Sequence, residues 1–114
     1  MLGNLGQLAQ VMKQAKELQS RLADVQKKLA QTRVEATAGG GMVTVTANGQ
    51  QEILTVKIDR AVVKPDEVEL LEELVLAAVN AARKKAEAVA REEMAALAGG
   101  LNLPPDFPIP GAAP

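Results

Sequence analysis

The chain has 114 residues and a formal net charge of −1, and it contains neither cysteine nor histidine. This length allows one domain with a modest core, and the missing cysteines exclude a disulfide framework and thiolate metal ligands. Aromatic residues make up only 1% of the chain. Because proteins that bind single-stranded DNA or RNA stack bases on aromatic rings, base stacking is excluded as a main mechanism.

Positive charge is concentrated near the N-terminus. Residues 1–33 carry six basic and two acidic side chains, whereas residues 65–98 carry four basic and eight acidic ones. A binding partner responds to the local field rather than to the net charge. The slightly acidic total therefore leaves room for a basic surface on the first segment.

The first segment predicts one long helix over residues 4–32. Apolar residues occupy heptad positions a and d through four repeats: Leu8, Val11, Ala15, Leu18, Leu22, Val25 and Leu29, with Thr32 at the last d position. The segment lacks the apolar run of a signal peptide, and no stretch reaches the roughly 18 apolar residues of a membrane span. A cytoplasmic location is expected.

The middle of the chain alternates with a period of two, which predicts three strands over residues 34–38, 43–47 and 53–58. Asn48-Gly49 predicts a tight hairpin with a type I′ turn, in which both central residues have positive φ. We expect an antiparallel meander with a threonine-rich face and an apolar face. The residues expected in the core are Val43, Val45, Leu54, Val56 and Ile58.

A second helix is predicted from Pro65 to about Ala98, with acidic residues in its first turn and Gly99-Gly100 ending it. Residues 101–114 hold five of the six prolines and predict an irregular tail. The chain is therefore divided into one domain, residues 1–100, and a proline-rich C-terminal tail, residues 101–114.

A helix of about 30 residues is roughly 45 Å long, whereas a compact domain of this size is about 30 Å across. Three strands cannot cover two such helices, and the sheet keeps two free edges. The expected fold is an α+β subunit, a three-stranded antiparallel sheet flanked by two long helices, in a homodimer with projecting helical arms.

The order of short motifs resembles the YbaB/EbfC family of nucleoid-associated proteins over nearly the whole chain. After the glutamine- and lysine-rich helix, the resemblance rests on Gly39-Gly40-Gly41-Met42-Val43, Asn48-Gly49, Ile58-Asp59, Leu71-Glu72-Glu73-Leu74-Val75, Asn80, Gly99-Gly100 and Leu103-Pro104-Pro105. It implies an α-β-β-β-α subunit, a tweezer-like homodimer and low-specificity binding to duplex DNA in the bacterial nucleoid. The chain departs from the usual family pattern at Thr44, where many members carry lysine, and at Ala81 and Asp106.

With base stacking excluded, the remaining mechanism is binding of basic side chains to the backbone and shape of duplex DNA. Most basic residues of the first helix lie on one flank of its apolar seam, and both acids lie on the other; Arg83, Lys84 and Lys85 form a second set. Glu87 precedes Arg91 by four residues and could pair with it. The predicted DNA-binding residues are Lys13, Lys16, Arg21, Lys27, Lys28, Arg33, Arg83, Lys84 and Lys85.

Other site types fit the sequence poorly. The glycines before Met42 lack the Lys-Ser or Lys-Thr and the following helix of a phosphate-binding loop. Without histidine or cysteine there is no ordinary nucleophile and base pair, and Glu67, Glu69, Glu72 and Glu73 suit a helix N-terminus better than a metal site. We expect no enzyme, cofactor, metal, membrane or small-molecule substrate. The alternative function is a coiled-coil adaptor or chaperone-like module that does not bind DNA.

Overall fold

The computed structural model describes residues 2–100, with side chains from residue 4 onward. The chain begins with helix α1 (Leu2–Gln31). Three strands come next: β1 (Arg33–Ala38), β2 (Val43–Asn48) and β3 (Ile53–Ile58). The short 3-10 helix η1 (Arg60–Val62) and helix α2 (Val68–Gly100) complete the described chain. The expected α-β-β-β-α order is confirmed. The proline-rich tail lies outside the described residues.

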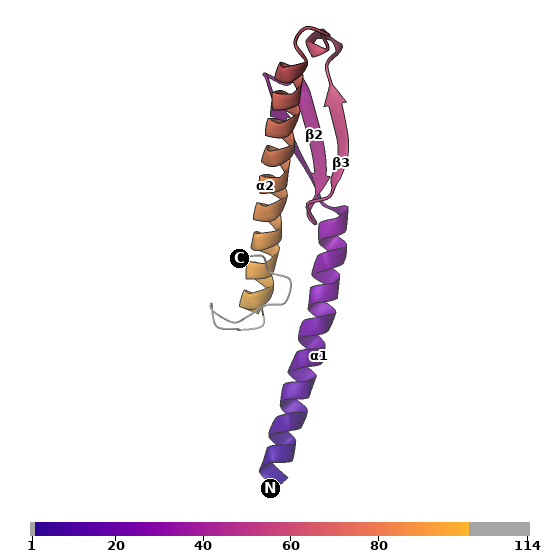
Figure 1. The fold of residues 1–114 in the computed structure, drawn as a ribbon. Coiled ribbons are helices and arrows are strands. Elements are labelled where there is room, and N and C mark those ends of the chain that lie inside the picture. Colours follow the sequence, from indigo (N-terminus) through magenta and orange to yellow (C-terminus); the bar gives the residue numbers. More distant parts are fainter. Residues whose placement is uncertain (1, 101–114) are drawn as a thin grey trace.

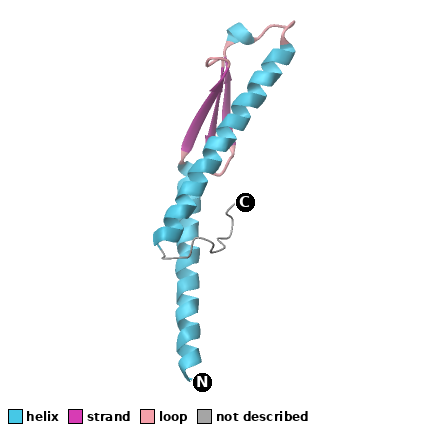
Figure 2. Ribbon diagram, turned by 90° about the vertical axis from the view of Figure 1, so that its left-hand side faces the viewer, coloured by secondary structure: helices cyan, strands magenta, loops and turns pink. Residues whose placement is uncertain are grey.

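The three strands form an antiparallel sheet in the order β1-β2-β3. Helix α2 lies along one face of the sheet and packs mainly on β1 and β2 (Figure 2). Three alanines four residues apart, Ala78, Ala82 and Ala86, are fully buried along α2, and Ala78 and Ala82 belong to the core. Because alanine side chains are small, the helix approaches the buried Val43 and Val45 of β2 closely.

Strand β3 differs from the expected core arrangement. Leu54, Val56 and Ile58 are 39–44% exposed, so their assignment to the core of the single chain is wrong. The alternation itself is present, because Val56 pairs with Val45 and Ile58 with Val43. Helix α2 leaves this part of the apolar face uncovered because it lies over the other two strands.

Helix α1 projects far beyond the sheet and beyond the end of α2 (Figure 1). The principal-axis extents are 77 × 22 × 17 Å. Near its C-terminus Leu29 is buried and Leu22 and Val25 are half-buried, whereas Leu5, Leu8, Val11 and Met12 are 55–63% exposed. The heptad seam is therefore covered at one end only, and the expected projecting arm is present.

The hairpin after β2 forms, but the predicted type I′ turn is wrong. Gln51 donates its N–H to Asn48 O at 3.1 Å, and Gln51, with φ of 65°, is the one non-glycine residue with positive φ in the described chain. The Asn48 side chain directs this geometry, because its Oδ1 accepts from the N–H groups of Gln50 and Glu52.

The second helix also has different ends. It begins at Val68 rather than at Pro65, because Pro65 and Asp66 form a turn closed by the Glu67 N–H donating to Lys64 O at 3.0 Å. Proline suits that turn since its fixed φ matches the second position. Gly99 and Gly100 remain helical, so the expected end at Ala98 is wrong as well.

Candidate DNA interface

The direction of α1 is set by the loop between β2 and β3. Gly49 donates its N–H to Leu29 O at 2.8 Å and to Thr32 O at 3.2 Å. The next side chain, Gln50, donates from Nε2 to both the backbone O and Oε1 of Gln26, at 3.2 Å each. These bonds hold the last two turns of α1 against the sheet, and the rest of the helix extends away from it as an arm.

The C-terminus of α1 is capped by its own neighbours. Thr32 donates its N–H and its hydroxyl to Lys28 O, at 3.0 and 2.7 Å, and Arg33 Nη1 donates to Ala30 O at 3.0 Å. The last carbonyls of a helix have no partner within the helix. Arg33 therefore has a structural role, and a phosphate would compete with this cap.

Three other predicted DNA-binding residues also have partners. Arg21 pairs with Glu17 at 3.4 Å, and Lys28 of α1 pairs with Glu93 of α2 at 2.8 Å. Lys85 Nζ donates to Glu35 O at 2.7 Å, which joins α2 to β1. Arg91, which was not in the predicted set, pairs with Glu87 at 2.7 Å as its spacing suggested.

The remaining five predicted cations are exposed and make no hydrogen bond or ion pair within the described chain. They are Lys13, Lys16 and Lys27 on α1, and Arg83 and Lys84 on α2. A charge without a partner can meet a phosphate without first breaking another contact. These five are the strongest candidates for DNA contacts.

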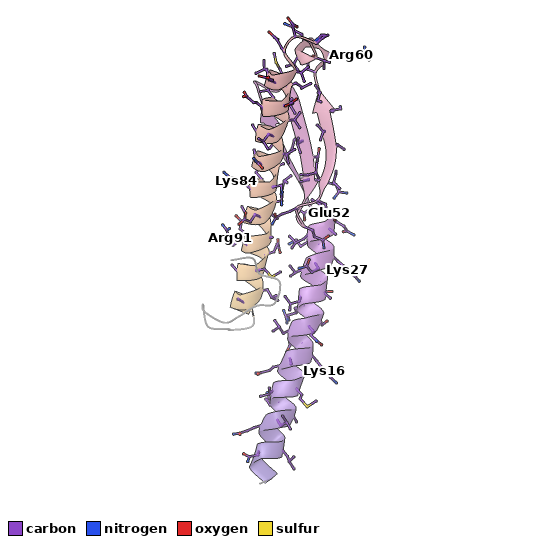
Figure 3. All side chains as sticks on the ribbon, in the orientation of Figure 1. Lys16, Lys27, Glu52, Arg60, Lys84 and Arg91 are labelled. Carbon is purple, nitrogen blue, oxygen red and sulfur yellow. The ribbon has the colours of Figure 1, made fainter. Side chains whose placement is uncertain are left out.

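The structure does not bring the two sets together within one chain. Lys16 and Lys27 lie on the side of α1 away from α2, and Lys84 lies on the side of α2 away from α1 (Figure 3). Since α2 packs on the seam side of α1, the opposite heptad positions of Lys13 and Lys27 must face away from α2. One subunit thus presents two separate basic stripes on opposite sides.

The polar face of the sheet carries a cation that sequence reasoning missed. The register places Lys57 of β3 directly opposite Thr44 of β2. A type I′ turn at Asn48-Gly49 would have placed Ile53 there, so the wrong turn hid this pairing. Lys57 therefore supplies positive charge directly beside Thr44.

On the other face an apolar groove of about 490 Å³ lies between β3 and α2. Glu72 is the one charged residue that lines it, and the others are Ile58, Val68, Leu71, Val75, Leu76 and Val79. Together with exposed Leu54 and Val56, this groove forms a continuous apolar surface beside the unpaired edge of β3. We call it the β3 surface.

Within residues 2–100, no group of three or more carboxylates is placed to hold a metal ion. None of the described helices contains an apolar stretch long enough to cross a membrane.

Comparison with known proteins gives consistent results. Residues 4–101 match the YbaB/EbfC DNA-binding family. A nucleoid-associated protein of Syntrophobacter fumaroxidans is 51% identical over 100 residues, covering 88% of this chain and 90% of that protein. One of Paramagnetospirillum magneticum is 51% identical over 107 residues, covering 94% and 97%.

Among solved structures, the fold is similar to that of an uncharacterized protein from Helicobacter pylori, with a TM-score of 0.68. The match has 24% sequence identity and covers 76% of this chain and 90% of that one. The family match spans both helices and all three strands, so it covers every element described above. The chain belongs to the YbaB/EbfC DNA-binding family.

Proposed function

We propose that this protein is a nucleoid-associated protein that binds duplex DNA as a homodimer, with low sequence specificity and without catalysis. The observation that carries the proposal is the set of five exposed cations without partners, on the two long helices of a chain from a DNA-binding family. The relatives at about 50% identity are named nucleoid-associated proteins.

The chemistry of the exposed side chains supports phosphate contacts rather than base reading. Lysine and arginine bind the DNA backbone without regard to sequence, whereas bases are read mostly by paired polar groups in the major groove. The free cations of α1 lie on a helix that carries only two acidic residues, Glu17 and Asp24. This arrangement favours contact along the backbone.

The β3 surface supports the homodimer. Monomeric proteins rarely leave a large contiguous apolar patch beside a free strand edge. A second copy that covers Leu54, Val56 and Ile58 and fills the groove would complete the core that α2 leaves open. Two arms and two sets of α2 cations would then act on one duplex, which raises affinity through linked contacts.

The test is a salt titration of binding to random duplex DNA. The variant Lys13→Ala/Lys16→Ala/Lys27→Ala removes three free cations per subunit, or six per dimer. If half of these contact phosphates, the slope of log K against log salt becomes shallower by about 3, at roughly 0.9 per contact. The control Arg21→Ala/Lys28→Ala/Arg91→Ala removes equal charge from residues that are already paired.

A DNA-binding protein of this kind binds random duplex with roughly micromolar affinity at low salt. Equal losses in the two triple variants would show that the free cations are not the interface. If the wild-type protein binds no duplex at 50 mM salt, the proposed function is wrong and the adaptor alternative gains support.

A further inference from the structure

The N-terminal half of the arm has an apolar seam that nothing in the described chain covers. Leu5, Leu8, Val11 and Met12 form one stripe of α1 and are each more than half exposed. Toward the C-terminus the same seam is covered by α2, where Leu29 is buried. The heptad pattern continues without a break between the two halves.

We propose that this uncovered seam pairs with the same seam of a second copy, so that the arms of two DNA-bound dimers join and bridge two duplex segments. The inference rests on the proposed function for its setting, but the contact itself is between protein chains. The seam of residues 5–18 can pack against the same seam of another copy, because a/d residues of one helix fit between a/d residues of another.

The residues that flank the seam support self-pairing. Heptad positions e and g, which set partner choice through charge, hold Leu5, Gln7, Met12, Gln14 and Gln19. None of these is charged, so two copies can approach without repulsion. The basic side chains of this half, Lys13 and Lys16, lie at f and b and point away from the seam. Joined arms therefore keep these lysines free for phosphate.

The length of the seam predicts a weak contact. Residues 5–18 span about two heptads, fewer than the roughly three to four of a typical coiled coil. Free dimers should therefore stay apart at low concentration. Dimers held close together on DNA have a high effective concentration, and the arms then pair.

The alternative occupant to be excluded is the C-terminal segment 101–114, which contains Leu101, Leu103, Phe107 and Ile109. A variant that ends at Gly100 removes it while keeping every described element. If this segment covers the seam, the shortened chain pairs much more strongly through its arms than the full chain. Equal pairing of the two chains excludes this occupant.

The absence of native cysteine allows a direct test. Val11→Cys places one thiol near the middle of the uncovered seam, where copies meet in either a parallel or an antiparallel pair. The matched control, Ala9→Cys, is also at an exposed position, lies at heptad position b and faces away from the seam. A disulfide needs Cα atoms within about 7 Å, so mild oxidation reports direct pairing of arms.

We expect Val11→Cys to cross-link at least fivefold faster than Ala9→Cys, both at high protein concentration and at low concentration when DNA is added. The linked particle should contain four chains by light scattering. A two-chain particle would place the contact inside one dimer, and equal rates for the two variants would show random collision. Either result overturns the proposal.

The companion variant Leu8→Gln/Val11→Gln separates this inference from DNA binding. A single dimer of this variant should bind a short duplex with unchanged affinity, while bridging of two labelled duplexes falls at least fivefold. Unchanged bridging contradicts the arm contact but leaves DNA binding intact. If the wild-type protein does not bind the short duplex, the proposed function is wrong. Cross-linking of Val11→Cys without DNA would still test whether the arms pair.

Discussion

The backbone N–H of Gly49 donates to the carbonyl oxygen of Leu29 at 2.8 Å, and this bond joins the β2–β3 loop to the last turn of α1. Leu29 is only 2% exposed, and its side chain lies against the glycine. The direction of the arm therefore depends on a backbone contact that only glycine permits.

Gly49→Ala should weaken this joint. An added Cβ would lie 2.8 Å from Leu29 Cδ2 and 2.9 Å from Leu29 O, and the backbone oxygen cannot move without shifting the helix. The expected loss in the free energy of unfolding is about 1–3 kcal/mol, measured by urea denaturation. The control Gly6→Ala has no atom within 4 Å of the new methyl group and should not destabilise α1. Equal stability of both variants would show that the contact is not needed.

Asn48→Ala tests the loop itself. The Asn48 side chain is buried, its Oδ1 accepts from two backbone N–H groups, and its Nδ2 donates to Glu52 Oε1 at 2.9 Å. Removing it leaves those groups without partners, at a cost of about 1–3 kcal/mol. Asn48→Asp keeps the acceptor but faces the Glu52 carboxylate, so it should recover only part of the stability. Thermal unfolding by circular dichroism distinguishes the three proteins, and a stable Asn48→Ala would contradict the role of this side chain.

Glu93→Gln should strengthen DNA binding. The ion pair with Lys28 is largely exposed on the lysine side, so its loss changes stability by less than about 1 kcal/mol. The freed lysine on the arm then adds a phosphate contact, and affinity for duplex rises several-fold at low salt but little at high salt. Fluorescence anisotropy measures this effect. Glu87→Gln, which frees Arg91 outside the proposed interface, is the control; an equal gain there would mean that net charge matters and position does not.

Val56→Asp should separate the two copies of the proposed homodimer. The Val56 side chain lies exposed on the β3 surface. The proposed second copy would bury the new carboxylate without a partner, which is strongly unfavourable. Sedimentation should show a monomer at micromolar concentration, and duplex affinity should fall because linked contacts are lost. Thr55→Asp introduces the same charge on the opposite face of the same strand, where Thr55 bonds Thr46 at 2.7 Å. That control should remain a dimer, and a dimeric Val56→Asp would show that the interface lies elsewhere.

The sequence predicted the elements well because the apolar pattern has one period in each segment. The a/d heptads indicated α1, and the alternation of Val43 and Val45 with threonine indicated β2, both as observed. The sequence pattern predicted the wrong turn between β2 and β3, because a side chain rather than the apolar pattern determines the backbone conformation there. The Asn48 amide selects a turn with Gln51 in the left-handed region. This turn, together with a register shift between Thr46 and Ala47, places Lys57 beside Thr44.

The sequence identified the basic residues of the candidate interface, but it did not show which of them are free and which are paired. Nine cations were predicted, and the sequence could not distinguish Lys27, which is free, from its neighbour Lys28, which bonds Glu93 across 65 residues of chain. Pairing over such a separation depends on how α2 folds back along α1. The family relationship, by contrast, could be recognised from short motifs in order, and the match over residues 4–101 confirms it.

The amino-acid order alone therefore determined the two helices, the three strands and the excess of positive charge on α1, because periodicity and composition act along the chain. Tertiary structure alone decided that α2 covers β1 and β2 but not β3, and that only the last turns of α1 are held. The physical reason is that burial and ion pairing depend on which surfaces meet in space. The course of α2 leaves Val56 uncovered and brings Glu93 to Lys28.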